Sequence, residues 1–282
     1  MDLISAVVIT YNEEEHIGRC LDSLRQVADE IIVLDSFSTD KTVEIAKSKG
    51  AIVKQRKFSG YIQQKNAAIV FCSHDYILSL DADEALDKVL VSAILAEKNN
   101  FSAGAYCMSR CTNYCGKYVR YGTWYPDRKI RLFNRHIASW GGDDPHEKIE
   151  LKKNIQVPRL KGDILHYSFD TIAAHIKKCD KYSSLSAEAM YARGVKSKWI
   201  KILLNPLWAF FYAYFMRLGF LDGFYGFVIA MNSAHATFLK YAKLYQLQQN
   251  IQVVKNKTNV HAGSNVYSKK MEKDFHHKHQ GV

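Results

Sequence analysis

The sequence contains no uninterrupted run of about 20 apolar residues, the length that a helix needs to cross a bilayer. The apolar segment 202–216 spans only 15 residues and is interrupted by Asn205-Pro206, and the segment 218–239 contains Asp222. Neither segment therefore predicts a membrane-spanning helix. The start, Met1-Asp-Leu-Ile-Ser5, also lacks the basic residues and the long apolar stretch of a secretory signal. We therefore expect a cytoplasmic protein.

The cysteine pattern lacks the signature of a zinc site. The chain has six cysteines, and Cys107, Cys111 and Cys115 are spaced by four residues. This spacing does not match the paired Cys-x-x-Cys pattern of structural zinc sites. Because cytosolic thiols stay reduced, we expect free cysteines.

Acidic residues are outnumbered by basic ones. The 282 residues include 39 Lys and Arg against 28 Asp and Glu, a net charge of +11. Such an excess predicts an anionic partner, which could be a nucleic acid, a nucleotide or a membrane surface. Much of the excess lies late in the chain, since residues 177–217 carry eight Lys or Arg and two acids.

The first hundred residues alternate apolar runs with amphipathic segments. Four runs have the composition of buried parallel strands: 3–9, 30–35, 51–54 and 76–80. Three segments between them have helical patterns: 13–26, 39–50 and 60–71. Asn12 is placed to cap the first of these helices. The alternation predicts an α/β fold, a mostly parallel sheet flanked by helices.

Polar residues follow three of these predicted strands, at Thr10-Tyr-Asn12, at Asp35 and at Asp81-Ala-Asp83. Because ligands of open parallel sheets bind at the carboxyl ends of strands, we expect these residues to converge on one edge. Asp81 and Asp83 are two residues apart, so in extended chain both can face one ligand. Carboxylate oxygens suit Mg²⁺ or Mn²⁺.

Four motifs in chain order resemble those of family 2 glycosyltransferases. They are Val8-Ile-Thr-Tyr-Asn-Glu13, Val33-Leu-Asp-Ser-Phe-Ser-Thr-Asp-Lys-Thr42, Gln64-Lys-Asn66 and Leu78-Ser-Leu-Asp-Ala-Asp-Glu84. The resemblance implies the GT-A fold, a Rossmann-like nucleotide-binding domain. It also implies a nucleotide-sugar donor, a divalent metal and inversion at the anomeric carbon.

Later segments resemble one branch of that family, the lipopolysaccharide core β-1,4-glucosyltransferases that act on inner-core heptose. They are Tyr125-Pro-Asp-Arg-Lys-Ile-Arg-Leu-Phe-Asn-Arg135, Pro145-His-Glu147, Gly219-Phe-Leu-Asp-Gly223 and Phe238-Leu-Lys-Tyr-Ala-Lys243. This resemblance implies transfer of glucose from UDP-glucose to a lipopolysaccharide core heptose or a related lipid-anchored bacterial glycan. Another polysaccharide or lipid-linked acceptor is the alternative.

The resemblance also assigns residues to the donor. Those expected to contact the nucleotide sugar are Thr10, Tyr11, Asn12, Glu13, Asp35, Lys65, Asp81, Arg128 and Arg131. Asp83, together with Asp81, is expected to bind the metal. Phe37 stands after Asp35 and Ser36, where the family often has Gly. The conformation of this loop is therefore expected to differ from that of the family.

Transfer further requires charge neutralisation and a base. Arg128 and Arg131 are candidates to offset the charge of the leaving group. The acceptor hydroxyl must lose a proton, for which a carboxylate well downstream of the metal motif is needed. Glu147 is the first candidate for this general base, Asp144 the second and Asp143 the third.

The last third predicts helices at a membrane surface. Trp and Tyr residues occur there with flanking cations, a composition typical of interfacial helices. The flanking cations are Lys196, Lys198, Lys201, Arg217, Lys240 and Lys243. A helical hairpin packed as core is the alternative. We therefore predict a GT-A domain at 1–168, a helical region associated with the anionic cytoplasmic face of the inner membrane at 169–249, and a flexible basic tail at 250–282.

Two other classes of function are less compatible with the sequence. A sugar-1-phosphate nucleotidyltransferase needs a Gly-rich loop after the first strand, but the segment here is Thr10-Tyr-Asn-Glu-Glu-Glu15, which contains no Gly. A non-catalytic basic module could bind a membrane or nucleic acid. The carboxylates at the strand ends would repel nucleic-acid phosphates, so no nucleic-acid partner is expected.

Overall fold

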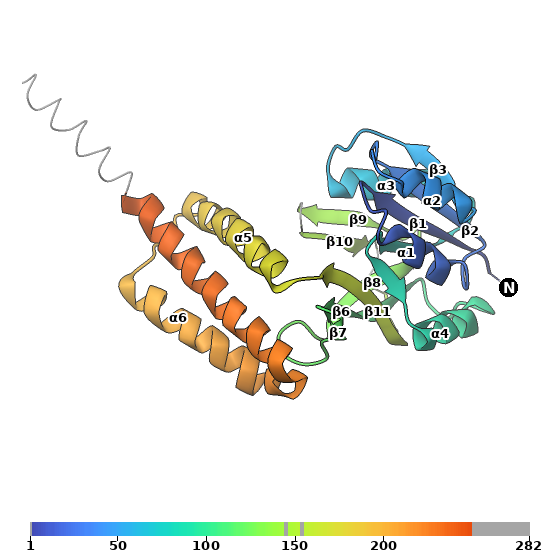
Figure 1. Ribbon diagram of the computed structural model, residues 1–282. Helices are drawn as coiled ribbons and strands as arrows, with labels where there is room; N and C mark the ends of the chain where they lie inside the picture. Colours follow the sequence, from blue (N-terminus) through green and yellow to red (C-terminus); the bar gives the residue numbers. More distant parts are fainter. Residues whose placement is uncertain (1, 144–145, 153–154, 250–282) are drawn as a thin grey trace, which may run out of the picture. The chain divides into compact units, whose positions relative to one another are not determined.

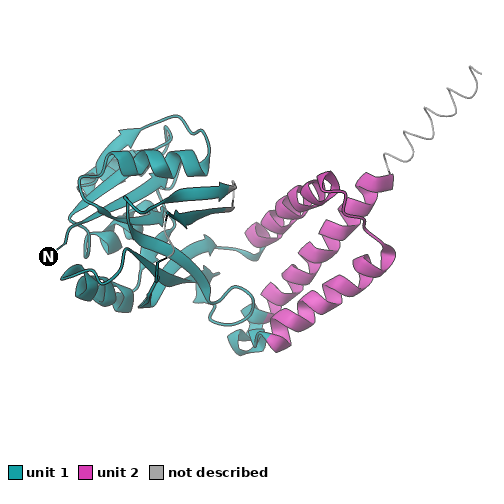
Figure 2. Ribbon diagram, turned by 180° about the vertical axis from the view of Figure 1, so that it is seen from behind, with its two compact units in different colours: residues 1–172, 217–226 teal, residues 173–216, 227–282 magenta. Residues whose placement is uncertain are grey.

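The structure is a computed structural model that describes residues 2–143, 146–152 and 155–249 (Figure 1). It contains two compact units (Figure 2). Unit 1 comprises the described residues up to Ile172 together with Arg217–Gly226, and unit 2 comprises Ala173–Met216 and the described residues from Phe227 onward.

Unit 1 is built on a nine-stranded sheet, counted over the described residues, with the order β3-β2-β1-β4-β8-β6-β11-β5 and β7 beside β6. The strands are β1 (Ile4–Thr10), β2 (Glu30–Asp35), β3 (Ile52–Gln55), β4 (Tyr76–Asp81), β5 (Glu84–Leu86), β6 (Ala105–Tyr114), β7 (Lys117–Tyr118), β8 (Asp127–Asn134) and β11 (Arg159–Phe169). Strands β9 (Ala138–Asp143) and β10 (His146–Leu151) form a separate antiparallel hairpin.

The parallel half of the sheet consists of the four strands expected from the apolar runs. β2 and β4 both pair with β1 in parallel, and β3 extends the series beyond β2. The other half is mixed, because β8 pairs antiparallel with both β4 and β6. Strand β11 had no sequence signal, since charged and polar residues such as Lys161, Asp163 and His166 interrupt its apolar pattern.

Helices cover one face of the sheet, and a helix with a hairpin covers the other. α1 (Ile17–Leu24) and α4 (Lys88–Lys98) pack in the first hydrophobic cluster with Ile4 and Val8 of β1. α3 (Tyr61–Val70) and the β9–β10 hairpin pack in the second cluster, which includes Val7. Alternate residues of β1 therefore enter opposite layers, as the twofold period of a strand requires.

The expected cap of the first helix is wrong. α1 begins at Ile17, and residues 14–16 form a turn before it. Asn12 instead has a positive φ of 53°, and its side-chain oxygen accepts the backbone N–H of Thr39 at 2.8 Å. Asn12 thus links the loop after β1 to the loop before α2 (Thr42–Ser48).

Unit 2 is helical. It includes most of α5 (Ile172–Ala192), α6 (Trp199–Phe211), the π-helical turn Tyr212–Met216 and most of the helix over residues 223–249. A buried polar pair joins two helices, since Asn232 Nδ2 lies 3.0 Å from His175 Nδ1. Burial lowers the pKa of His175 to about 4, so this imidazole stays neutral at pH 7. None of the described helices combines the length and the apolar character needed to cross a membrane.

Candidate active site

The strand ends meet as expected. In the register of the sheet, Thr10 pairs with Asp35 and Ile9 pairs with Asp81, so β1, β2 and β4 end side by side. The chain therefore leaves the sheet at three neighbouring points, and the loops that follow carry Tyr11, Glu13 and Asp83 to the same edge.

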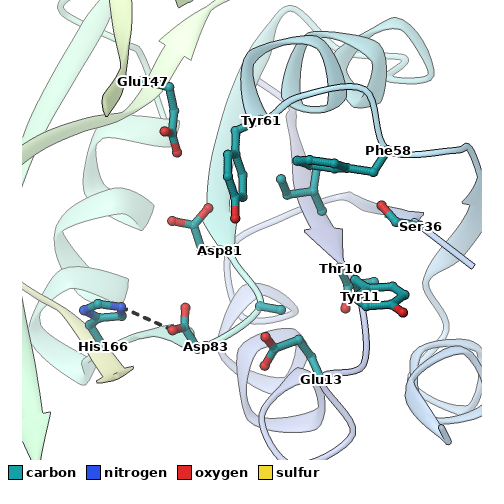
Figure 3. A pocket seen from close by; sticks show the side chains of 12 residues that line it. Thr10, Tyr11, Glu13, Ser36, Phe58, Tyr61, Asp81, Asp83, Glu147 and His166 are labelled. Carbon is teal, nitrogen blue, oxygen red and sulfur yellow. Dashed lines mark ion pairs between the residues drawn. The ribbon is translucent and has the colours of Figure 1, made fainter. Parts of the chain in front are cut away.

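A cavity of about 520 Å³ opens at this edge (Figure 3). We call it the acidic cavity, because carboxylates lie on several of its walls. Its lining residues are Ile9, Thr10, Tyr11, Glu13, Ser36, Phe58, Tyr61, Asp81, Ala82, Asp83, Glu147 and His166. Six of the candidate residues from the sequence thus share one cavity: Thr10, Tyr11, Glu13, Asp81, Asp83 and Glu147.

Negative charge is incompletely balanced beside Asp83. Its Oδ2 lies 3.2 Å from Nε2 of His166, and its side chain keeps 28% of its surface exposed. Burial and the neighbouring carboxylates of Asp83, Asp40 and Asp81 raise the pKa of Glu13 from 4.5 to about 7. A carboxyl group whose pKa rises in this way would be ionised again by a cation placed beside it.

The residues on these walls fit a divalent metal. Asp83 and Asp81 offer hard oxygen ligands, and both side chains remain partly exposed, at 28% and 29%. Asp81 is the more occupied of the two, because both of its oxygens contact cations of the protein. Asp83 is therefore the principal candidate ligand, with Asp81 second.

An ion-pair network joins Asp81 to Glu147, the candidate general base. Lys65 Nζ lies 2.7 Å from Asp81 Oδ1 and 2.8 Å from Glu147 Oε1. Arg131 Nη2 lies 2.9 Å from Asp81 Oδ2 and 3.0 Å from Glu84 Oε1. Burial would raise the pKa of Asp81, but Arg131 and Lys65 outweigh it and hold that pKa well below its usual range.

Lys65 is a buried residue of the site and not a surface lysine of α3. Its side chain is 2% exposed, and its ammonium group lies 4.2 Å from the ring centroid of Trp140. A desolvated cation over an indole ring is stabilised by the ring quadrupole. Lys65 is thereby committed to Asp81, Glu147 and Trp140.

Asp35 is buried at the end of β2, and protein groups occupy its oxygens. It accepts hydrogen bonds from the backbone N–H of Ser38 at 3.0 Å, from the Ser38 hydroxyl, and from Gln55 Nε2 at 3.1 Å. Phe37 adopts a φ of 64°, the left-handed conformation that Gly adopts most readily. The loop therefore keeps a Gly-like backbone although it carries an exposed aromatic residue.

Arg128 and Arg131 lie at a second cavity of about 530 Å³, which we call the basic cavity. Its lining residues are Asp81, Arg110, Arg128, Lys129, Ile130, Arg131, Trp140, Glu147, Lys148 and Ile149. Asp81 and Glu147 line both cavities. The structure thus brings Arg128 near the candidate base, but not to the wall that holds Tyr11, Glu13 and Asp83.

The candidate bases differ in what the structure describes. Glu147 lies on β10, is 15% exposed, and reaches both cavities. Asp144 lies outside the described residues, and Asp143 ends β9.

Sequence reasoning missed several residues of the site. His166 had no signal, because its strand, β11, was not expected. Phe58 and Tyr61 line the acidic cavity and pack edge to face, with ring centroids 5.1 Å apart. The sequence did contain a signal for them. Phe58 and Tyr61 flank Ser59-Gly60 in the loop that follows the third predicted strand, and this loop leaves the sheet at the same edge as Tyr11.

Comparisons with known proteins agree with this architecture. The family description "Glycosyl transferase family 2" matches residues 5–156. The chain belongs to glycosyltransferase family 2, and its α/β architecture is the GT-A fold of that family. It is therefore an enzyme that transfers a sugar.

Relatives share most of the chain. A protein of Rickettsia bellii described as an uncharacterized glycosyltransferase is 37% identical over 255 residues, which is 86% of each chain. The lipopolysaccharide core biosynthesis glycosyltransferase LpsC of Rhizobium meliloti is 31% identical over 86% of this chain and 92% of its own. A solved structure of glucosyl-3-phosphoglycerate synthase from Mycobacterium tuberculosis, in complex with Mn²⁺ and UDP, is also similar. It is 25% identical with a TM-score of 0.34, and the match covers 40% of this chain and 44% of that one.

Proposed function

We propose that the protein transfers glucose from UDP-glucose to a heptose of a lipopolysaccharide core, or to a related bacterial surface glycolipid, with inversion at the anomeric carbon. The observation that carries this proposal is the acidic cavity, in which Tyr11, the Asp81–Asp83 pair and Glu147 face one space. The similarity to LpsC supports the choice of acceptor.

The nucleotide binds at the ends of β1 and β2. The aromatic residues Tyr11, Phe58 and Tyr61 give the uracil ring apolar surface. The hydroxyl oxygen of Thr10 is buried there without a hydrogen-bond partner among the described residues, so it is available to a ligand. Asn12 and Asp35 hold the shape of this wall through their bonds to the Ser38–Thr39 segment.

Asp83, with Asp81, holds the divalent metal. When bound, Mg²⁺ or Mn²⁺ neutralises charge that develops on the diphosphate as the sugar leaves. Lys65 and Arg131 keep Asp81 ionised and oriented. His166 orients Asp83, since its Nε2 lies 3.2 Å from Asp83 Oδ2.

Glu147 acts as the general base. Its carboxylate accepts the proton of the acceptor hydroxyl, and the acceptor oxygen forms a bond to the anomeric carbon of glucose. The bond between that carbon and the phosphate oxygen breaks on the opposite side, and UDP leaves with the electron pair. Lys65, 2.8 Å from Glu147 Oε1, fixes the position of this base. A single displacement inverts the configuration.

A panel of UDP-sugars tests the donor assignment without knowledge of the acceptor. With Mg²⁺ or Mn²⁺ present, we expect UDP-glucose to release UDP slowly by hydrolysis and faster than the other UDP-sugars. UDP with Mn²⁺ should also raise the melting temperature, because a ligand that binds only the folded state stabilises it. A protein whose melting temperature ignores UDP with metal would contradict the proposal.

A lipid-anchored acceptor favours an enzyme that resides on the cytoplasmic face of the inner membrane. α6 supports this location, because it exposes an apolar stripe with helical spacing. The stripe, which we call the α6 face, consists of Trp199, Ile200, Leu203, Leu204, Leu207, Trp208 and Phe211. Lys196, Lys198 and Lys201 lie at its start and suit anionic headgroups. We assign membrane association to the helical region 169–249.

Liposome flotation tests this location. We expect the full chain to bind vesicles that contain phosphatidylglycerol, and to bind less as salt rises. Leu203→Asp combined with Leu207→Asp, at positions 61% and 68% exposed, should reduce binding by more than about tenfold. Leu185→Asp on α5, 47% exposed, is the matched control. Equal flotation of all three proteins would exclude the α6 face.

A further inference from the structure

The basic cavity has an excess of positive charge that the reaction outlined above does not use. Five cationic side chains from β6, β8 and β10 line it, against two carboxylates, Asp81 and Glu147. The cations are Arg110, Arg128, Lys129, Arg131 and Lys148. Such a concentration of one sign in a cavity attracts anions.

Acidic residues neutralise some of these cations but not all. Asp127 lies 2.7 Å from Arg110 Nη2 and 3.2 Å from Lys129 Nζ. Lys148 Nζ lies 3.9 Å from its carboxylate partner, at the outer limit of an ion pair. Arg128 is exposed and forms no ion pair with any residue that the structure describes.

Arg131 adds an independent observation. Its side chain is only 4% exposed, and its Nη2 contacts Asp81 and Glu84. Its Nε and Nη1 are buried without a hydrogen-bond partner among the described residues, as is Nε1 of Trp140. Buried donors without partners reduce stability, and acceptor oxygens supplied by a ligand would remove that penalty.

The wall between the two cavities relates this charge to the reaction. Among the described residues, Glu147 and Asp81 line both cavities, whereas Tyr11, Glu13 and Asp83 line the acidic cavity alone. If the donor occupies the acidic cavity, an acceptor hydroxyl can reach Glu147 from the basic cavity. Trp140, Ile130 and Ile149 give that cavity apolar surface for a sugar ring.

We propose that the basic cavity binds a phosphate or carboxylate group of the acceptor sugar, and thereby positions the acceptor hydroxyl at Glu147. The proposal rests on the donor assignment made above. It defines the acceptor as an anionic glycan. Lys129, Lys148 and Arg128 hold the anionic group, and buried Arg131 contributes its charge.

Simple sugars serve as probes of this subsite. Mannose 6-phosphate carries a phosphate, galacturonic acid carries a carboxylate, and methyl mannoside is neutral. Each is titrated by calorimetry into the full-length protein, with and without UDP and Mn²⁺. We expect at least one anionic sugar to bind about tenfold or more tightly than methyl mannoside, as charge-assisted hydrogen bonds predict. The anion that binds more tightly identifies the source.

Variants locate the binding. Lys129→Ala combined with Lys148→Ala removes two charges at side chains that are 39% and 70% exposed, so we expect a folded protein. It should lose the preference for anionic sugars. Lys161→Ala, an exposed lysine outside the cavity, should retain it. Arg128→Ala is a second test that depends on a single exposed side chain.

The outcomes distinguish the anionic subsite from the donor assignment. Equal binding of charged and neutral sugars, or an anion preference that survives both sets of substitutions, overturns the anionic subsite. Parallel loss of UDP binding in these variants also overturns it, because the cations would then serve the donor diphosphate. Failure of UDP with Mn²⁺ to stabilise the wild-type protein overturns the donor assignment instead.

Discussion

The acidic and basic cavities share a wall, but their other charged residues come from different parts of unit 1. The acidic cavity takes its carboxylates chiefly from the ends of parallel strands and the loops that follow them. The basic cavity takes its cations from β6, β8 and β10, which lie in antiparallel pairs. Under the two proposals above, the parallel half carries the donor and metal sites, whereas the mixed half and the β9–β10 hairpin define the acceptor.

Glu147→Gln tests the shared wall and should have the largest effect. The amide cannot accept the acceptor proton, so transfer should fall by about 10²–10⁴-fold. UDP and anionic sugars should both still bind, because the substitution removes only the Glu147 carboxylate and leaves Asp81, Asp83 and the cations of the basic cavity in place. UDP release in the presence of acceptor measures the rate, and calorimetry measures the binding.

Glu150→Gln is the matched control, since Glu150 lies on the same strand and its side chain is 54% exposed. Full activity in Glu147→Gln would move the general base to Asp144.

Lys65→Met removes the cation that pairs with both Asp81 and Glu147, which line the two cavities in common. Asp81 and Glu147 would lose a partner whose side chain is 2% exposed, so stability should fall by about 3–5 kcal/mol. Denaturant unfolding measures this loss. Lys49→Met breaks an exposed pair with Asp22 and should cost about 1 kcal/mol or less. Similar losses in the two variants would refute the structural role of Lys65.

Asp83→Ala distinguishes ligand binding in the acidic cavity from ligand binding in the basic cavity. It should abolish the stabilisation by UDP with Mn²⁺ and reduce transfer by about 10²–10³-fold. Binding of the preferred anionic sugar should persist, because Asp83 does not line the basic cavity. Asp75→Ala, which removes an exposed carboxylate elsewhere, serves as the control. Loss of both ligands in Asp83→Ala would mean that the two cavities act as one.

The pH dependence of stability reports on the acidic cavity with the smallest expected effect. Without metal, Glu13 holds its proton up to about pH 7 in the folded state, whereas the unfolded chain releases it near pH 4.5. The folded state binds more protons at Glu13 in this window, so the contribution of Glu13 to stability falls as pH rises from 4.5 to 7.

Relative to Glu13→Gln, the melting temperature of the metal-free wild type should fall by about 2–4 °C across this window. Differential scanning calorimetry with and without Mn²⁺ measures the difference, which the metal should reduce. A wild type and a variant with the same pH profile would contradict the raised pKa.

Local patterns were sufficient to predict the parallel half. Apolar runs gave the four strands, and a polar residue after a buried strand has only one edge at which to emerge. The sequence alone was therefore enough to assign four residues to one site: Tyr11, Glu13, Asp81 and Asp83. The predicted helix cap at Asn12 was wrong, because a capping residue followed by polar residues also fits a turn. The side chain of Asn12 instead accepts a hydrogen bond from Thr39, in a loop distant in sequence.

The sequence by itself determined the class of protein and the residues at the strand ends, because strand order and motif spacing are local properties of a β–α series. Tertiary structure alone decided that Lys65 is buried against Glu147, 82 residues away, and that His166 reaches Asp83. It also decided that Arg128 and Arg131 line a separate cavity. Antiparallel strands and hairpins join distant segments, and no periodicity along the chain records which partner each of them will have.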